Sequence, residues 1–171
     1  MPDDPDADPV DIAREIALRL LSVRGRTRHE LAQALAKRRV PAEAAQEVLD
    51  RLCEVGLIDD QRFAEAVFDA QHRRQRSSKA LRQELRSKGV EADVIDEASA
   101  GVPDGLDLEV ARALVAKRAP SLGRVPHQVR YRRLAGQLAR RGFSPGVIAT
   151  VLRDLGNEPS LSWPEADSGD G

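Results

Sequence analysis

Three stretches of this chain align without a gap: residues 27–40 read TRHELAQALAKRRV, residues 77–90 read SSKALRQELRSKGV, and residues 130–143 read RYRRLAGQLARRGF. Each stretch has leucines at its fifth and ninth positions, and each ends on a valine or a phenylalanine. The alignment extends to Leu52, Val102 and Leu155, with further apolar residues at matching positions. Self-similarity of this kind is the signature of a tandem repeat.

Each copy is predicted to form two helices. The two leucines, four residues apart, lie on one face of the first helix, and the later apolar positions form the stripe of the second. Thr27 and Ser77 are suitable N-caps for the first helix. Gly89 and Gly142 mark the break between the helices, where glycine favours a left-handed C-cap. The first copy departs from this pattern, because Arg39 stands at the glycine position.

A third helix is predicted before each pair. Its apolar positions have helical spacing; they are Ile16, Leu20 and Leu21, then Phe63, Val67 and Phe68, then Val110, Leu114 and Val115. The predicted fold is therefore all-α and elongated, with three tandem three-helix repeats and about nine helices. The repeats span residues 12–57, 58–102 and 106–156, and disordered acidic tails are expected at 1–11 and 158–171.

The composition excludes several classes of protein. Aromatic residues make up only 3% of the 171 residues, which disfavours a β-sandwich or barrel. The single cysteine, Cys53, excludes an internal disulfide framework. No apolar run is long enough to span a bilayer, and no signal peptide is evident. We therefore expect a cytoplasmic protein that does not bind membranes.

The net charge of −1 conceals a segregation of charge. All 27 Lys and Arg residues lie between positions 12 and 157, and 23 of them are Arg. The two tails carry nine acidic residues and no basic one, which leaves a net charge of +8 between them. An arginine-rich body indicates a polyanionic or acidic partner.

No catalytic or metal-binding arrangement is evident. The histidines His29, His72 and His127 are far apart and lack the spacing of metal ligands. Asp59 and Asp60 are paired carboxylates, but they stand at the predicted start of a helix, where acids are favoured. The chain is therefore not expected to be an enzyme or to need a cofactor.

The candidate binding residues are basic. At 100° per residue, Lys79, Arg82 and Arg86 fall within about 60° of one another on one helix face. Arg133 and Arg140 share the corresponding face of the third repeat. The full set predicted to contact a partner is Arg73, Arg74, Arg76, Lys79, Arg82, Arg86, Lys88, Arg132, Arg133 and Arg140.

Several of these stretches together resemble the RecX family of regulatory proteins. The resemblance rests on Gly56-Leu57-Ile58-Asp59-Asp60 followed by Arg62-Phe63-Ala64, on the segments 27–35 and 81–90, and on Arg140-Arg141-Gly142-Phe143, and it covers about residues 12–156. It implies a protein without catalytic residues that binds the RecA recombinase filament on single-stranded DNA. It also implies that RecA's ATPase and strand exchange are inhibited, which would modulate recombination and DNA repair.

Two alternatives remain open at this point. One is a helix-turn-helix-like protein that binds DNA independently of RecA, and the other is a helical scaffold for a different acidic protein. The basic face could also contact single- or double-stranded DNA beside RecA. A monomer is expected, because the repeats account for the apolar positions.

Overall fold

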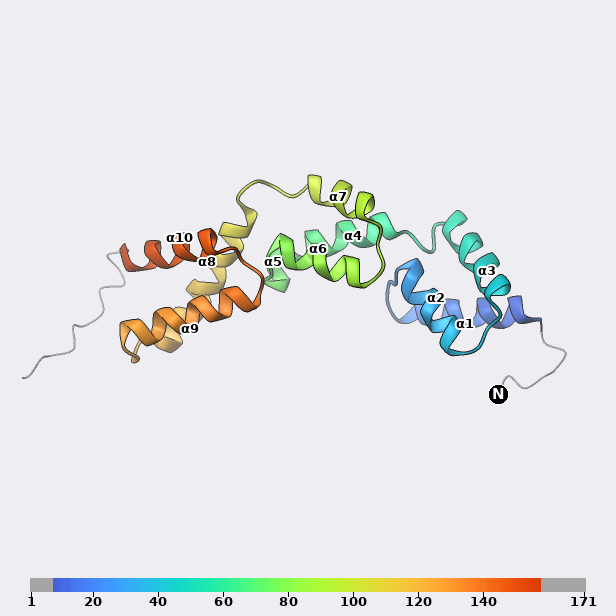
Figure 1. Cartoon of the computed structure of the whole chain (residues 1–171), viewed down its shortest axis with the longest axis horizontal. Coiled ribbons are helices and arrows are strands. Elements are labelled where there is room, and N and C mark those ends of the chain that lie inside the picture. Colours follow the sequence, from blue (N-terminus) through green and yellow to red (C-terminus); the bar gives the residue numbers. More distant parts are fainter. Residues whose placement is uncertain (1–7, 158–171) are drawn as a thin grey trace, which may run out of the picture. The chain divides into compact units, whose positions relative to one another are not determined.

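The computed structural model describes residues 8–157, and this part of the chain is helical without a strand (Figure 1). The elements are α1 (Pro9–Val23), α2 (Arg28–Lys37), α3 (Ala42–Glu54), α4 (Asp60–Asp69), α5 (Gln71–Arg74), α6 (Ser78–Ser87), α7 (Ala92–Ala100), α8 (Leu106–Arg118), the 3-10 turn η1 (Ala119–Leu122), α9 (His127–Arg140) and α10 (Pro145–Asn157). The all-α prediction is confirmed. The sequence pattern missed only the short α5 and η1.

The described residues form two units. The first runs to Asp69 and includes Arg82–Val102, and the second contains Ala70–Leu81 and the chain from Pro103 onward. Helix α6 contributes its first turn to the second unit and the remainder to the first. Each unit is described by itself below.

The core of the first unit is built by α1, α2 and α3, which pack against one another (Figure 1). Two alanines of α1 are fully buried, and their small side chains let the other two helices approach closely. The buried residues of this core are Ala13, Ala17, Leu31, Leu35, Val48, Leu49, Leu52 and Ile58. Helix α4 packs against α7 in the same unit.

The core of the second unit lies between α8, α9 and α10. The repeat leucines of α9, Leu134 and Leu138, are 1% and 0% exposed, which confirms the predicted buried face. They pack with Val110, Ala111, Leu114, Val115, Phe143, Val151 and Leu152. An ion pair of 2.7 Å between Arg112 and Asp154 joins α8 to α10 on the surface.

The first helix begins earlier than the predicted repeat boundary at residue 12. The Asp8 carboxylate accepts a hydrogen bond of 2.9 Å from the Val10 N–H, and Pro9 occupies the first helical turn. A carboxylate cap followed by proline favours helix initiation at this point. Residues 1–7 of the predicted N-terminal tail, and all of the predicted tail at 158–171, lie outside the described residues.

Within the first unit, one joint connects successive repeats. It consists of the first turn of α2, the loop 88–90 and Asp60. The Thr27 hydroxyl donates to the carbonyl oxygen of Lys88 at 2.7 Å, and the Arg28 N–H donates to Asp60 Oδ1 at 3.0 Å. The Lys88 ammonium forms a 2.9 Å ion pair with Glu30. The start of α2 is therefore held by groups of the following repeat.

A second joint, within the second unit, repeats this arrangement at the first turn of α6. The Ser77 N–H donates to the carbonyl oxygen of Arg141 at 3.0 Å, and the Ser78 N–H donates to Asp107 Oδ1 at 2.8 Å. Asp107 also accepts from the buried Gln71 amide at 2.6 Å. Asp60 and Asp107 hold equivalent positions in their repeats, as do Lys88 and Arg141.

The joints explain the two glycines of the repeat. Gly89 and Gly142 have φ angles of +73° and +86°, which glycine adopts readily. A Cβ on Gly89 would lie 2.2 Å from Cγ of His29, and one on Gly142 would lie 2.7 Å from Cβ of Ala80. The preceding helix therefore leaves no room for a side chain at either position.

Each joint pairs a capped helix start with a glycine loop and an aspartate of the following repeat. The first repeat lacks the glycine and the aspartate, and the last repeat lacks the capped helix start. In the first repeat, Arg39 replaces the glycine at a φ of +61°, and Ala13 occupies the position equivalent to Asp60 and Asp107. In the last repeat, α9 begins a turn earlier, so that Arg130 lies inside the helix where Thr27 and Ser77 are caps.

Glu30 gives the first joint a pH dependence. Burial acts to raise its pKa, but hydrogen bonds from Arg24, Lys88 and the Thr27 N–H outweigh this and hold the pKa at about 2. A depressed pKa stabilises the fold above the unfolded value of about 4.5 and loses that effect as the pH falls toward 2.

We expect the protein to be more stable than its Glu30→Gln variant by about 1–2 kcal/mol at pH 7, after allowance for solvent screening. The difference should shrink between pH 4.5 and pH 2, because protonated Glu30 loses its ion pairs. Urea unfolding of both proteins across this range measures the difference. A gap that stays constant with pH would contradict the assignment.

Candidate functional site

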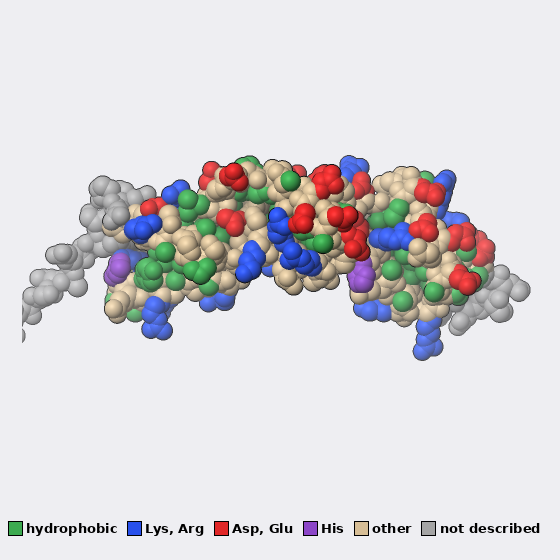
Figure 2. Space-filling model, turned by 45° about the horizontal axis from the view of Figure 1, so that its top comes forward, with side chains coloured by type: hydrophobic (Ala, Val, Ile, Leu, Met, Phe, Trp, Pro, Cys, Tyr) green, Lys and Arg blue, Asp and Glu red, His purple; other side chains and the backbone are tan. Residues whose placement is uncertain are grey.

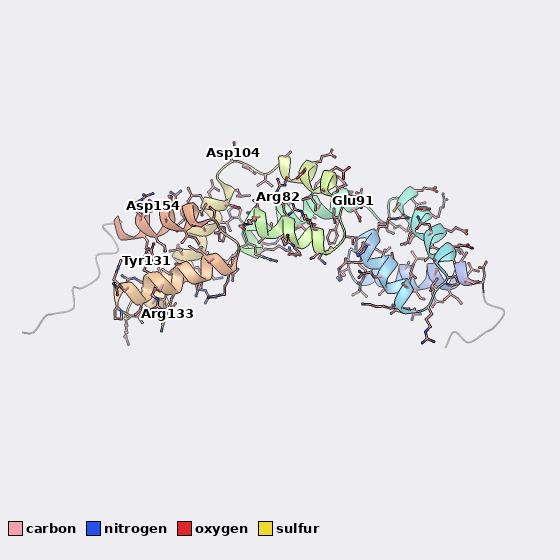
Figure 3. All side chains as sticks on the ribbon, viewed as in Figure 1. Arg82, Glu91, Asp104, Tyr131, Arg133 and Asp154 are labelled. Atoms are coloured by element: carbon pink, nitrogen blue, oxygen red, sulfur yellow. The ribbon has the colours of Figure 1, made fainter. Side chains whose placement is uncertain are left out.

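The clearest basic surface of the second unit lies on α9. Arg132, Arg133 and Arg140 are exposed and border one open depression of about 420 Å³ with Val129 and Gln137. None of its lining residues is acidic. Arg133 projects from α9 on the side away from α10 (Figure 3). Arg133 and Arg140, which share a face in the sequence pattern, border the same depression, and Arg132 lies beside them.

Two other predicted contact residues already have partners in the first unit. The Arg82 guanidinium donates to Asp96 at 2.6 Å and to the Ser99 hydroxyl at 2.5 Å. Lys88 belongs to the first joint, and its ammonium also lies 5.7 Å from the centroid of the Phe63 ring. These contacts give both side chains a structural role that helix periodicity did not reveal.

The remaining candidates differ in exposure. Arg73, Lys79 and Arg86 are exposed, whereas Arg76 is half-buried. Arg74 is exposed as well, and its carbonyl oxygen accepts from the Arg141 guanidinium at 3.3 Å in the second joint. Figure 2 shows acidic side chains (red) interspersed with basic ones (blue) on the face that it draws.

The paired carboxylates of the sequence analysis have separate structural roles. Asp59 accepts from the Arg62 N–H at 2.9 Å and so caps its own helix, whereas Asp60 holds the preceding repeat. Burial raises the pKa of Asp60, and the hydrogen bond from Arg28 opposes this shift. The pair therefore acts in capping and in the joint.

The other potentially reactive side chains form no cluster in the described chain. Cys53 is half-buried and lies 3.4 Å from the Arg28 guanidinium. Within residues 8–157, no three His, Cys, Asp or Glu side chains come together in a way that could hold a metal ion. No helix in this part of the chain is both long and apolar enough to cross a bilayer.

Comparison with known families accounts for this architecture. The family models for the first, second and third three-helix domains of RecX match residues 13–52, 59–98 and 106–152, in that order. The chain belongs to the RecX family. The models cover most of the two joints as well as the three helix bundles, and their order matches the repeats expected from the sequence. The exact limits of the three repeats remain predictions.

Curated relatives support the RecX assignment over most of the chain. A protein named "Regulatory protein RecX" from Streptomyces coelicolor is 48% identical over 151 residues, which cover 88% of this chain and 80% of the relative. Another of that name, from Thermobifida fusca, is 43% identical over 152 residues, covering 86% and 82%. The similarity therefore extends across all three RecX domains, and the chain is a regulatory protein of this family.

Solved RecX structures share the fold. The crystal structure of RecX from Lactobacillus salivarius superimposes with a TM-score of 0.73 at 23% identity, covering 87% of this chain and 97% of that one. A second structure, titled as that of regulatory protein RecX, gives a TM-score of 0.74 at 26% identity, covering 86% and 74%. The RecX fold is thus retained at low sequence identity.

Proposed function

We propose that this protein binds the RecA recombinase filament on single-stranded DNA and inhibits RecA's ATPase and strand exchange. The observation that carries the proposal is the match of all three RecX domains in order, together with relatives named as regulatory proteins. The described residues form helix bundles and joints, which suits a binding protein better than an enzyme. RecA and DNA are the proposed partners.

The arginines of α9 are the proposed centre of the contact. Arg132, Arg133 and Arg140 are exposed and share a depression whose lining contains no acid. Guanidinium groups bind carboxylates and phosphates in bidentate geometry, so this face suits either an acidic protein surface or a nucleic-acid backbone. Arg73, Lys79 and Arg86 are secondary candidates because they are exposed, whereas Arg82 and Lys88 are engaged within the fold.

The test measures RecA's ATP hydrolysis on single-stranded DNA as the protein is titrated in, with RecA from the same source. The wild type should inhibit at amounts well below those of RecA. The variant R132E/R133E/R140E should need at least about tenfold more protein, since three favourable contacts become repulsive. The matched control is K117E/R118E/R124E, which alters three exposed basic residues of the same unit by the same total charge.

Each outcome bears on a different part of the proposal. Absence of inhibition by the wild type would overturn RecA regulation, and salt-sensitive binding to bare duplex would then favour independent DNA binding. Equal loss in both variants would overturn the choice of α9, because net charge alone would explain it. Loss confined to the α9 variant supports both the function and the face.

A further inference from the structure

A hollow of about 80 Å³ lies in the second unit, where α9 begins and α10 ends (Figure 1). Three leucines and three polar side chains of α9 line it, and these are Leu134, Leu152, Leu155, His127, Arg130 and Tyr131. None of the described residues that line it is acidic. Tyr131 is 45% exposed and Leu155 is half-buried, so a large apolar side chain seated here would remove parts of both from water.

The chain continues from the edge of this hollow. Gly156 belongs to the lining, and α10 ends at Asn157, one residue later. The residues that follow, 158–171, lie outside the described part of the chain, and their sequence is EPSLSWPEADSGDG. Trp163 is six residues beyond Asn157, and an extended chain of that length spans about 20 Å. The indole of Trp163 is therefore within reach of the hollow.

The charge of this segment is opposite to that of the neighbouring face of α9. The segment carries four acidic residues and no basic one, and three of the acids, Glu165, Asp167 and Asp170, follow Trp163. Arg132, Arg133 and Arg140 border a depression whose lining contains no acid. From Tyr131 to Arg140 the helix extends only about 14 Å, and the seven residues from Trp163 to Asp170 span up to about 23 Å when extended. The acids can therefore reach all three arginines while Trp163 occupies the hollow.

We propose that the segment 158–171 binds its own second unit, with Trp163 in the hollow at the start of α9 and the acids against the α9 arginines. Tryptophan offers the largest apolar area of any side chain, and its ring can pack on that of Tyr131. Guanidinium groups bind carboxylates in bidentate geometry, so the arginines suit the acidic residues that follow.

Covalent attachment favours this segment over any separate occupant of the hollow. A segment joined to its site by a short linker has an effective concentration of about millimolar. A separate protein that offers the same side chains would need to reach that concentration to compete equally. Contacts too weak to hold a separate partner are therefore sufficient to hold the segment.

The docked segment would cover the arginines that we propose as the contact with RecA or DNA. It would act as an internal competitor, so that a partner must displace it before binding α9. This consequence rests on the proposed function, whereas the docking itself rests on the hollow, the sequence of the segment and the charges of α9.

The experiment measures acrylamide quenching of Trp163 in the full chain, where it is the only tryptophan. Acrylamide should quench it several-fold less than in an isolated synthetic peptide of residues 158–171, and its emission should lie at shorter wavelength. Tyr131→Ala and R132E/R133E/R140E should raise the quenching toward that of the peptide. The control K117E/R118E/R124E, with exposed residues of the same unit, should leave it unchanged.

A second pair of variants separates docking from unfolding of the helices. E165Q/D167N/D170N changes only the segment and should also raise the quenching, because it removes the charges that face the arginines. D3N/D4N/D6N removes as many acids before α1 and should leave the quenching unchanged. Equal effects of these two variants would contradict the pairing with α9.

Other outcomes would overturn the docking. Quenching of the wild type equal to that of the peptide would exclude it, and protection that rises with protein concentration would identify a second copy as the site. In the RecA ATPase titration, W163A should inhibit at several-fold lower amounts than the wild type. Equal inhibition would overturn the competition. Absence of inhibition by both would overturn the proposed function, and the quenching would still decide the docking.

Discussion

Gly89→Ala is expected to lower the free energy of unfolding of the first unit by about 3 kcal/mol. An alanine at a φ of +73° costs about 1 kcal/mol in backbone strain. Its Cβ would also lie 2.2 Å from Cγ and 2.4 Å from Cβ of His29. The Cβ of His29 is fixed by the helix backbone, so a rotamer change cannot remove the overlap and the joint must open.

Two positions supply matched controls for Gly89→Ala. Gly56 has the same φ of +73°, and nothing lies within 4 Å of a Cβ built there, so Gly56→Ala measures the strain alone. Arg39→Gly should be close to neutral, because relief of strain at φ +61° is offset by the added freedom of the unfolded chain. Urea unfolding followed by circular dichroism gives the values. Equal losses for Gly89→Ala and Gly56→Ala would contradict the role assigned to the joint.

Asp107→Ala is expected to destabilise the second unit by about 3 kcal/mol. One oxygen of this carboxylate accepts from the Ser78 N–H, the Ser78 hydroxyl and the Gln71 amide, at 2.8, 2.9 and 2.6 Å. Alanine would remove all three bonds and leave the start of α6 without its acceptor. Gln71 is fully buried, and its amide would keep the carbonyl oxygen of Arg76 as an acceptor at 3.1 Å, so the main loss falls on the Ser78 N–H.

Asp107→Asn should recover about half of this loss, because the asparagine oxygen can still accept from the Ser78 N–H but carries no charge. Asp104→Ala is the control, since Asp104 is exposed (Figure 3). Hydrogen exchange of the first-turn amides of α6 provides a local readout beside urea unfolding. A loss for Asp107→Ala no larger than that for Asp104→Ala would show that the network contributes little.

The helical repeat could be predicted from the sequence because its signal is periodic. The spacing of Leu31 and Leu35, and of their counterparts, fixes one buried face, and Thr27 and Ser77 do cap their helices as expected. The short α5 was missed because four residues are too few to show a helical period. The acidic, proline-containing segment before residue 12 fits a disordered tail by composition, but Asp8 and Pro9 also fit the start of α1, which begins at Pro9.

The basic contact site was less predictable, because the position of a charged residue on a helix face does not reveal which groups its side chain contacts in the fold. Arg82 and Arg86 share a predicted face, yet Arg82 reaches Asp96 fourteen residues away, while Arg86 is exposed. Such pairings depend on how helices pack, which periodicity cannot supply.

Each joint needs one set of residues at a helix start and a second set in the following repeat that holds it. This requirement also limits how such a chain could lengthen during evolution. Among the three repeats within residues 8–157, only the middle one carries both sets, with Ser77 and Ser78 at its helix start and Asp60 and Gly89 to hold the helix start of the first repeat. A tandem duplication of that segment would create a new junction with every required group in place. Duplication of either outer repeat would instead set Arg39 or Arg130 inside a junction, where each would obstruct packing. Longer descendants of this protein should therefore have grown from the middle.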